Sequence, residues 1–331
     1  MNAAPRPAHP TEEAGPLIAS IALLLASAAP TADANAGPVC TAVWHDTARD
    51  RDLPVRIRMP AGTARAPLLL FSPGVGGDAG SGGVLGAAWA RRGLIVIHLS
   101  HPGSDTAVYA GQLNKADRAA RVTAAIQFDQ LVARVGDARF VLDEAMRRPR
   151  EGTCDLGRID PDRIGAAGHS MGAWTVQALA GQRWPGGTLA DRRIRAAILL
   201  STSAPYVGDP AAAFGRIGLP MLSITGTLDG SSASAPADQR TADAAARTQV
   251  YRALPGDGRK TLLMLGGGTH MMFSGNSNAR DTTAAHIQQV MLAASTAFWG
   301  ATLLGSTRDA AWLSGTGLRS TLARDDAVER K

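Results

Sequence analysis

The chain has 331 residues, of which 45% are hydrophobic and 19% charged, with 37 glycines, 19 prolines and two cysteines. This composition excludes a disordered chain, and two cysteines are too few for a small disulfide-stapled protein. The 34 basic and 28 acidic residues give a net charge of +6. No basic stripe with interleaved aromatic residues accompanies this charge, so nucleic acid is not an expected partner. The length allows two domains, although a single α/β domain often reaches about 250 residues.

An apolar run extends from Pro16 to Pro30 near the start of the chain. It is shorter than the roughly 20 residues that a membrane-spanning helix needs. Small residues follow at Ala34 and Ala36, in the spacing that signal peptidase prefers. We therefore predict a signal peptide over residues 1–36. The protein would then be exported, periplasmic or secreted, without stable membrane insertion after the leader is removed; the alternative is an uncleaved N-terminal helix.

Cys40 and Cys154 are the two cysteines of this chain. In an exported protein such a pair often forms a disulfide. The sequence does not supply the Cα–Cα distance that a disulfide requires. One disulfide and two separate buried thiols are both open at this point.

Short β-rich runs alternate with amphipathic helical segments from Val39 onward. This alternation predicts an α/β fold with a mostly parallel, eight-stranded sheet and helices on both faces. The predicted strands are residues 41–45, 55–59, 68–72, 94–99, 164–169, 196–201, 221–225 and 261–265. The predicted helices are residues 83–91, 116–135, 140–146, 171–180, 237–252 and 284–303. Because no repeat or linker divides this region, we predict one domain over residues 37–314 and a polar, frayed C-terminal tail over residues 315–331.

The most informative motif is the G-x-S-x-G sequence from Gly168 to Gly172, between a predicted strand and a predicted helix. Its small residues allow a strained turn that lifts the Ser170 hydroxyl out of the sheet. The same turn directs the N-terminus of the following helix at a reacting carbonyl group, so the backbone N–H of Met171 can donate to an oxyanion. Ser170 is therefore the predicted nucleophile.

A serine nucleophile needs a general base and an acid that orients this base. In this strand–turn–helix context the partners follow the serine in the order acid, then histidine. His270 lies in a glycine-rich loop after the last predicted strand, and Asp229 follows the strand before it. We assign these two residues as base and acid, with Asp209 as the main alternative acid and Asp238 as a further one.

The second oxyanion donor is expected in the glycine-rich turn after the strand at residues 68–72. We assign it to the backbone N–H of Val75, with that of Gly74 as the alternative. Candidate residues of the substrate pocket are His101, Trp174 and Met271. For all three, packing in a loop or in the core is the competing interpretation.

Three segments carry a resemblance to a known group of proteins: SPGVGG at residues 72–77, HPGSD at 101–105, and GRIDPDR at 157–163 running into GHSMG at 168–172. They resemble the α/β-hydrolase superfamily, and specifically the bacterial group described as predicted dienelactone hydrolases. That group is similar to platelet-activating-factor acetylhydrolases and more distantly to cutinase-like polyester hydrolases. The likeness covers about residues 43–304.

The resemblance implies a Ser-His-Asp esterase that uses Ser170, His270 and Asp229, with Val75 and Met171 as oxyanion donors and no metal or organic cofactor. The chain departs from the family at three points. The oxyanion loop begins Ser-Pro-Gly at residues 72–74, where many relatives have His-Gly, although cutinase-like members also use Ser-Pro-Gly. A serine stands where true dienelactone hydrolases have a cysteine nucleophile. In the acetylhydrolases the acid follows the preceding strand, which keeps Asp209 open as the acid.

We therefore expect a serine hydrolase that cleaves carboxylic esters through an acyl-enzyme intermediate. Its expected partner is a small-molecule or lipid-like ester substrate. Acyl transfer or amide cleavage on the same triad is the enzymatic alternative, because fold and nucleophile do not define the acceptor. A hydrolase-fold binding protein without turnover is the alternative from another class.

Overall fold

The computed structural model describes residue 1 and residues 36–202, 208–230, 236–276 and 281–331. The predicted signal peptide therefore lies, except for its first and last residues, outside the described residues. Residues 34–331 form one compact unit. In the part of the chain that the structure describes, no helix is both long enough and apolar enough to cross a membrane.

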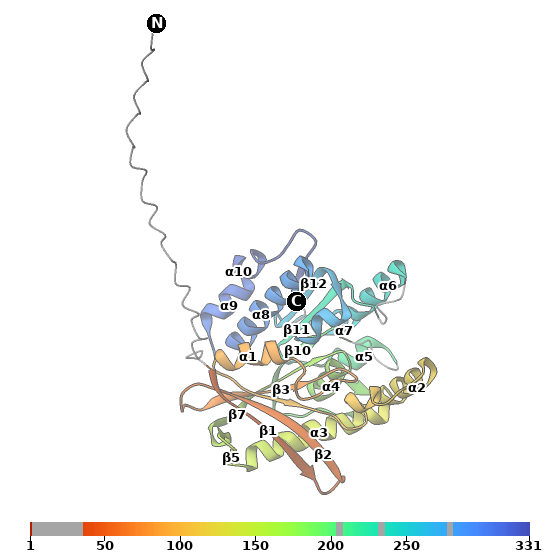
Figure 1. The fold of residues 1–331 in the computed structure, drawn as a ribbon, viewed down its shortest axis with the longest axis vertical. Coiled ribbons are helices and arrows are strands. Elements are labelled where there is room, and N and C mark those ends of the chain that lie inside the picture. Colours follow the sequence, from red (N-terminus) through yellow and green to blue (C-terminus); the bar gives the residue numbers. More distant parts are fainter. Residues whose placement is uncertain (2–35, 203–207, 231–235, 277–280) are drawn as a thin grey trace. The chain divides into compact units, whose positions relative to one another are not determined.

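Within the described residues, nine strands form one sheet in the order β1-β2-β4-β3-β7-β10-β11-β12-β13 (Figure 1). These strands are β1 (Ala36–Asp46), β2 (Arg51–Pro60), β3 (Ala66–Ser72), β4 (Ile95–Leu99), β7 (Ile159–His169), β10 (Ile194–Leu200), β11 (Met221–Leu228), β12 (Lys260–Thr269) and β13 (Ala327–Arg330). The strands from β4 to β12 in this order are parallel, whereas β1, β2 and β13 pair antiparallel at the two edges. Two short hairpins lie outside the sheet, β5 (Arg150–Glu151) with β6 (Cys154–Asp155) and β8 (Arg183–Trp184) with β9 (Gly187–Thr188).

All eight predicted strands are present, and the prediction of a mostly parallel sheet is confirmed. The ninth strand, β13, was not predicted because it is only four residues long and two of these residues are charged. It pairs antiparallel with β12, where Val328 lies opposite Leu263. The segment predicted as a frayed tail over residues 315–331 therefore differs from that expectation, since it forms a short helix and then an edge strand of the sheet.

Helices cover both faces of the sheet (Figure 1). They are α1 (Gly83–Arg91), α2 (Lys115–Ala125), α3 (Phe128–Arg147), α4 (Met171–Ala180), α5 (Pro210–Phe214), α6 (Ala237–Arg247), α7 (Gln249–Ala253), α8 (Thr282–Thr302), α9 (Thr307–Ser314) and α10 (Thr316–Arg319), with 3₁₀ turns η1 (Thr106–Tyr109), η2 (Leu156–Arg158) and η3 (His270–Ser274). The α3 and α4 helices pack in one apolar cluster, and α1 and α8 pack in the other. Strand β3 serves both clusters, since Leu68 and Leu70 face one and Leu69 and Phe71 face the other, as the two-residue period of a strand requires.

Two of the predicted helices, 83–91 and 171–180, have the predicted bounds. The helix predicted over residues 116–135 is divided into α2 and α3, because Gln127 adopts an extended conformation and its side chain donates to the Thr123 carbonyl at 2.8 Å. The segment at 140–146 is part of the continuous helix α3. The helix predicted over residues 237–252 is divided at Thr248 into α6 and α7.

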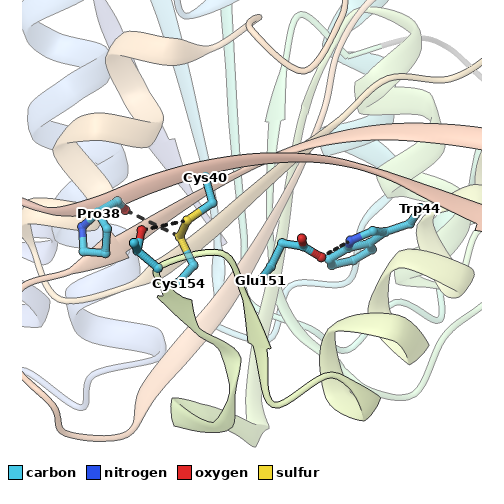
Figure 2. Close-up of a disulfide and its surroundings, with 6 residues drawn as sticks. Pro38, Cys40, Trp44, Glu151 and Cys154 are labelled. Carbon is cyan, nitrogen blue, oxygen red and sulfur yellow. Dashed lines mark hydrogen bonds between the residues drawn. A yellow bond between two sulfur atoms is a disulfide. The ribbon is translucent and has the colours of Figure 1, made fainter.

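Cys40 in β1 and Cys154 in β6 form a disulfide, with their Cα atoms 6.2 Å apart (Figure 2). Of the two possibilities left open by the sequence, the structure therefore has the bridge. A second tie lies nearby, because Trp44 Nε1 donates to Glu151 Oε2 at 2.8 Å (Figure 2). Both contacts fasten the edge strand β1 to the segment that leads into the central strand β7. A disulfide of this kind typically stabilises a fold by about 2–4 kcal/mol.

Candidate active site

Ser170 stands alone between β7 and α4, in a backbone conformation with φ 55° and ψ −121°. The turn is possible because the residues two positions before and after Ser170 are the glycines Gly168 and Gly172. A Cβ atom at Gly168 would lie 2.2 Å from the Gly172 carbonyl oxygen, and one at Gly172 would lie 1.9 Å from the Ser72 carbonyl oxygen. The predicted strand–turn–helix arrangement around the serine is therefore present, and both glycines are required by close backbone contacts.

His270 begins the 3₁₀ turn that follows β12, and its imidazole lies between two oxygen atoms. Its Nε2 is 3.0 Å from Ser170 Oγ, and its Nδ1 is 2.8 Å from Asp229 Oδ1. The anionic carboxylate favours a proton on Nδ1, which leaves Nε2 free to accept the serine proton. The structure thus brings together the three residues that the sequence assigned as nucleophile, base and acid.

Asp229 is fully buried just beyond β11. Burial alone would raise the pKa of its carboxyl, but the hydrogen bond from His270 and the positive charge of Arg247 outweigh burial and hold that pKa below its usual value. Thr225 Oγ1 also donates to Oδ2 at 2.7 Å. The carboxylate is therefore ionised at neutral pH and fixed from several directions.

Asp209, the main alternative acid, has a different place in the structure. It is the N-cap of α5, where its Oδ2 accepts a hydrogen bond from the Ala212 backbone N–H at 3.0 Å. The side chain of Asp238 lies outside the described residues. Of Asp229 and Asp209, the two candidate acids with described side chains, Asp229 is the one hydrogen-bonded to His270.

The glycine-rich loop after β3 packs directly against the serine turn. A Cβ atom at Gly74 would lie 3.2 Å from Ser170 Cβ. The loop is held in place on its other side because the Gly76 N–H donates to the Ser104 carbonyl at 2.8 Å. Val75 lies between these two glycines, and Met171 is the first residue of α4, so both candidate donors flank Ser170.

A cavity of about 510 Å³ opens over Ser170 and His270. Its apolar wall includes Tyr109, Val122, Ile126 and Met271, the last with 59% of its surface exposed. The remaining lining residues are the loop residues Pro73, Gly74, Val75, Gly76 and Gly77 and the polar residues Ser81, His169, Arg247, Ser274 and Asn276. The cavity next to the Ser170 hydroxyl is therefore lined by both apolar and polar groups.

Met271 lines this cavity as predicted, but His101 and Trp174 do not. His101 is fully buried, with Nε2 at 2.9 Å from Ser72 Oγ and Nδ1 at 3.0 Å from Asp137 Oδ2. Trp174 lies in the apolar core on the α3–α4 side of the sheet. The competing interpretation therefore describes both residues better than the pocket assignment: His101 packs within a loop, and Trp174 packs in the core.

Arg134 is a buried residue that the sequence analysis missed. Its guanidinium donates to Thr175 Oγ1 at 2.9 Å, to Ser104 Oγ at 2.8 Å, and to the carbonyl of Pro73. It therefore anchors the loop that carries Val75. The available signal was its position on the apolar face of α3, one residue before Val135, where a charge requires buried partners.

His169, the residue before the serine, links the serine turn to the histidine loop. Its Nε2–H donates to the His270 carbonyl at 3.0 Å, and the two rings lie 4.8 Å apart. Burial lowers the pKa of His169 to about 3, and the nearby imidazole of His270 is a second, smaller cause. His169 is therefore neutral at physiological pH and acts here as a hydrogen-bond donor.

Within the described ranges, no group of three or more His, Cys, Asp or Glu side chains is placed to hold a metal ion. The groups gathered around Ser170 are a hydroxyl, an imidazole, a carboxylate and backbone amides. Such a set can transfer an acyl group by general base catalysis.

No family model and no curated protein matches the sequence. Among solved structures, the chain is similar to a ferulic acid esterase from Streptomyces cinnamoneus, with a TM-score of 0.55 over 84% of this chain and 93% of that one. The chain has the α/β-hydrolase fold. The sequence identity is 20%, so the comparison establishes the fold and not the activity of this chain.

Three buried histidines should make the free energy of unfolding depend on pH. Burial lowers the pKa of His98 to about 3, of His101 to about 4 and of His169 to about 3, each from an ordinary value of 6.5. Below pH 6.5 the unfolded chain therefore binds protons that the folded chain excludes, and stability falls as the pH decreases toward 4. The expected loss is about 1.4 kcal/mol per pH unit for each histidine.

Urea unfolding at several pH values between 7 and 4.5 measures this loss. The ionised Asp137 and Asp229, whose pKa values are lowered from 3.8, lose their contribution mainly below this range. A free energy of unfolding that stays constant between pH 7 and 4.5 would contradict the expectation.

Proposed function

We propose that this protein is a serine hydrolase that cleaves carboxylic esters. The observation that carries the proposal is the chain of hydrogen bonds from Ser170 Oγ through His270 to Asp229, with distances of 3.0 and 2.8 Å. The hydroxyl stands at a strained turn, beside a cavity and against a glycine-rich loop. These are the features that a serine nucleophile needs.

In the proposed mechanism Ser170 Oγ attacks the ester carbonyl carbon while its proton moves to His270 Nε2. The alcohol then leaves with this proton, and the acyl group remains on Ser170. Water, deprotonated by His270, attacks the acyl-enzyme and releases the acid. Asp229 holds the proton of Nδ1 in place and stabilises the imidazolium that forms in each step.

The tetrahedral intermediates require donors for their negative oxygen. The proposed donors are the backbone N–H groups of Val75 and Met171, which lie on the two segments that flank Ser170. The N-terminus of α4 adds the positive end of a helix dipole to this site. Each such donor typically contributes about 10²- to 10³-fold to the rate.

The apolar wall of the cavity favours an ester with an apolar acyl or alkyl group, either a small molecule or lipid-like. Tyr109, Val122, Ile126 and Met271 supply this wall. The solved structure with the same fold is named as a ferulic acid esterase, which supports ester hydrolysis as the type of reaction. The closer likeness to dienelactone hydrolase-like and acetylhydrolase-like proteins rests on the three sequence segments and is part of this proposal.

We further propose that the protein is exported and loses residues 1–36. The disulfide between Cys40 and Cys154 supports an oxidising compartment. The intact mass of protein recovered from outside the cytoplasm should match a chain that starts after Ala34 or Ala36 and has lost two hydrogens. A mass that still includes residues 16–30 would exclude cleavage of the leader.

Replacement of the nucleophile tests the proposed activity. With a short-chain p-nitrophenyl ester, we expect Ser170→Ala to lower kcat by at least about 10⁴-fold, because no other hydroxyl takes its place at the turn. Ser314→Ala is the matched control, since Ser314 lies on α9 and its hydroxyl donates to the carbonyls of Ala310 and Ala311 in the same helix. A fluorophosphonate probe should label the wild type and the control but not Ser170→Ala. Full activity of Ser170→Ala would refute the assignment.

The identity of the acid is tested by a matched pair of variants. Asp229→Asn should lower kcat by about 10⁴-fold, because the amide no longer favours the proton on His270 Nδ1. Asp209→Ala should leave kcat unchanged and lower stability by about 1 kcal/mol, because it removes a helix cap. Ester assays together with denaturant unfolding distinguish the two effects. The opposite pattern would reassign the acid to Asp209.

A further inference from the structure

Ser201 lies directly after β10 and has a backbone φ of 57°. Among the described residues, three that are not glycine have a positive φ: Asp50, Ser170 and Ser201. Such conformations are unfavourable for side chains other than glycine, and they persist where surrounding contacts enforce them, often at functional sites. One of the three is the candidate nucleophile, so the conformation of Ser201 calls for a comparable explanation.

The hydroxyl of Ser201 is buried between the candidate acid and the candidate base. It donates to Asp229 Oδ1 at 2.9 Å and lies 2.8 Å from His270 Nδ1. The distance from Asp229 Oδ1 to the same nitrogen is also 2.8 Å. His270 Nδ1 therefore lies close to two oxygen atoms, a carboxylate oxygen from the loop after β11 and a hydroxyl oxygen from the end of β10. Arg247 Nη2 lies farther from it, at 3.2 Å.

The backbone of Ser201 is fixed as tightly as its side chain. Its N–H donates to the Ile224 carbonyl at 2.7 Å, and its carbonyl accepts from Arg247 Nη1 at 3.1 Å. These contacts hold the residue in its positive-φ conformation. They also direct the hydroxyl at the pair of Asp229 and His270.

We propose that Ser201 is a positioning residue for the Asp229–His270 pair, and that its position can carry the orienting acid in place of position 229. This inference rests on the proposed function, since it concerns the same reaction. In it, the Ser201 hydroxyl fixes the rotamer of the Asp229 carboxylate and shares the Nδ1–H of His270. The group therefore acts through His270 and does not touch the substrate.

The arrangement of the strands supports the second part of the proposal. The neighbours β10 and β11 are parallel, with Leu200 paired to Ile224, so their carboxyl ends meet at the same edge of the sheet beside His270. Arg247 serves both ends, because it donates to the Ser201 carbonyl and its Nε lies 3.0 Å from Asp229 Oδ1. One fixed cation could therefore pair with a carboxylate from either strand.

Electrostatics explain why position 201 carries a neutral hydroxyl while position 229 carries the acid. A second buried carboxylate within hydrogen-bonding distance of Asp229 would repel it, and one of the two would take up a proton. A carboxylate at position 201 is therefore expected to impair the site when Asp229 is present and to support it when Asp229 is absent. The effect of this carboxylate on kcat should therefore change sign with the residue at position 229, and this reversal is specific to the proposal.

The first experiment removes the hydroxyl and keeps the backbone. Glycine accepts φ 57° without strain, so Ser201→Gly should leave the thermal midpoint nearly unchanged or higher. On a short-chain p-nitrophenyl ester it should lower kcat on the order of tenfold with KM unchanged. A merely structural role would instead lower the midpoint and leave kcat intact. An unchanged kcat would overturn the positioning role.

The second experiment exchanges the two residues. Asp229→Ser alone should lower kcat by about 10⁴-fold. The double variant Ser201→Asp/Asp229→Ser should recover at least tenfold of this loss, whereas Ser201→Asn/Asp229→Ser, which has nearly the same shape without the charge, should recover none. Ser201→Asp in the wild-type background should be slower than the wild type. Circular dichroism confirms that each variant is folded.

A folded double variant no faster than Asp229→Ser would overturn the exchange of the acid, as would equal recovery by the Asn control. If the double variant does not fold, the proposal that position 201 can accept the acid is refuted as well. Failure of the proposed function is distinguishable from both results. It would show as a wild-type protein that neither hydrolyses the ester nor reacts with a fluorophosphonate at Ser170.

Discussion

Gly172 contacts the carbonyl group of Ser72 so closely that no side chain fits between them. This contact joins the start of α4 to the end of β3, the direct parallel neighbour of the strand β7 that leads into α4. Since Ser170 precedes this helix and the glycine-rich loop follows this strand, the same contact brings the hydroxyl and the loop amides together. The sharp turn at Ser170 and the glycines at positions 168 and 172 both belong to that close approach.

The polar residues beneath the site keep this arrangement in place. Arg134 donates to the Pro73 carbonyl and to Ser72 Oγ, and the buried His101 and Asp137 continue this network from Ser72. On the other side, Arg247 ties the ends of β10 and β11 to α6. Buried charges of this kind are tolerated only where every one has partners. Burying these charged groups costs free energy, and the same groups hold the glycine-rich loop and Asp229 in fixed positions.

Sequence reasoning found the parts of this protein whose signals are local. Continuous apolar runs marked the central strands, and the G-x-S-x-G motif marked the turn at Ser170. Strand ends located Asp229 and His270, because parallel strands bring their carboxyl ends to one edge. The short polar strand β13 and the break between α2 and α3 carry no comparable signal, since neither proline nor glycine marks them.

The residues that were missed act through contacts between distant elements. In the sequence, Arg134 and Arg247 look like ordinary helix residues. Their contacts become visible only in the structure, where α3 and α6 pack against the ends of the strands. Ser201 reads as the last residue of an apolar strand, and its role becomes visible only with the two distances to Asp229 and His270. The pocket assignments of His101 and Trp174 failed for the same reason, because the sequence does not say which side of a loop or helix faces the cavity.

The disulfide cross-links the N-terminal part of the chain and leaves the C-terminal part without a cross-link. Cys40 and Cys154 are 114 residues apart, and the loop that they close contains β2, β3, β4 and α1–α3. In the unfolded chain this loop has fewer conformations, so the entropy lost on folding is smaller for this half than for the rest. Ser170, Asp229 and His270 all lie after Cys154, in the half that has no cross-link. The bridge thus restrains the scaffold that presents the glycine-rich loop after β3, while Ser170, Asp229 and His270 are held by packing and hydrogen bonds.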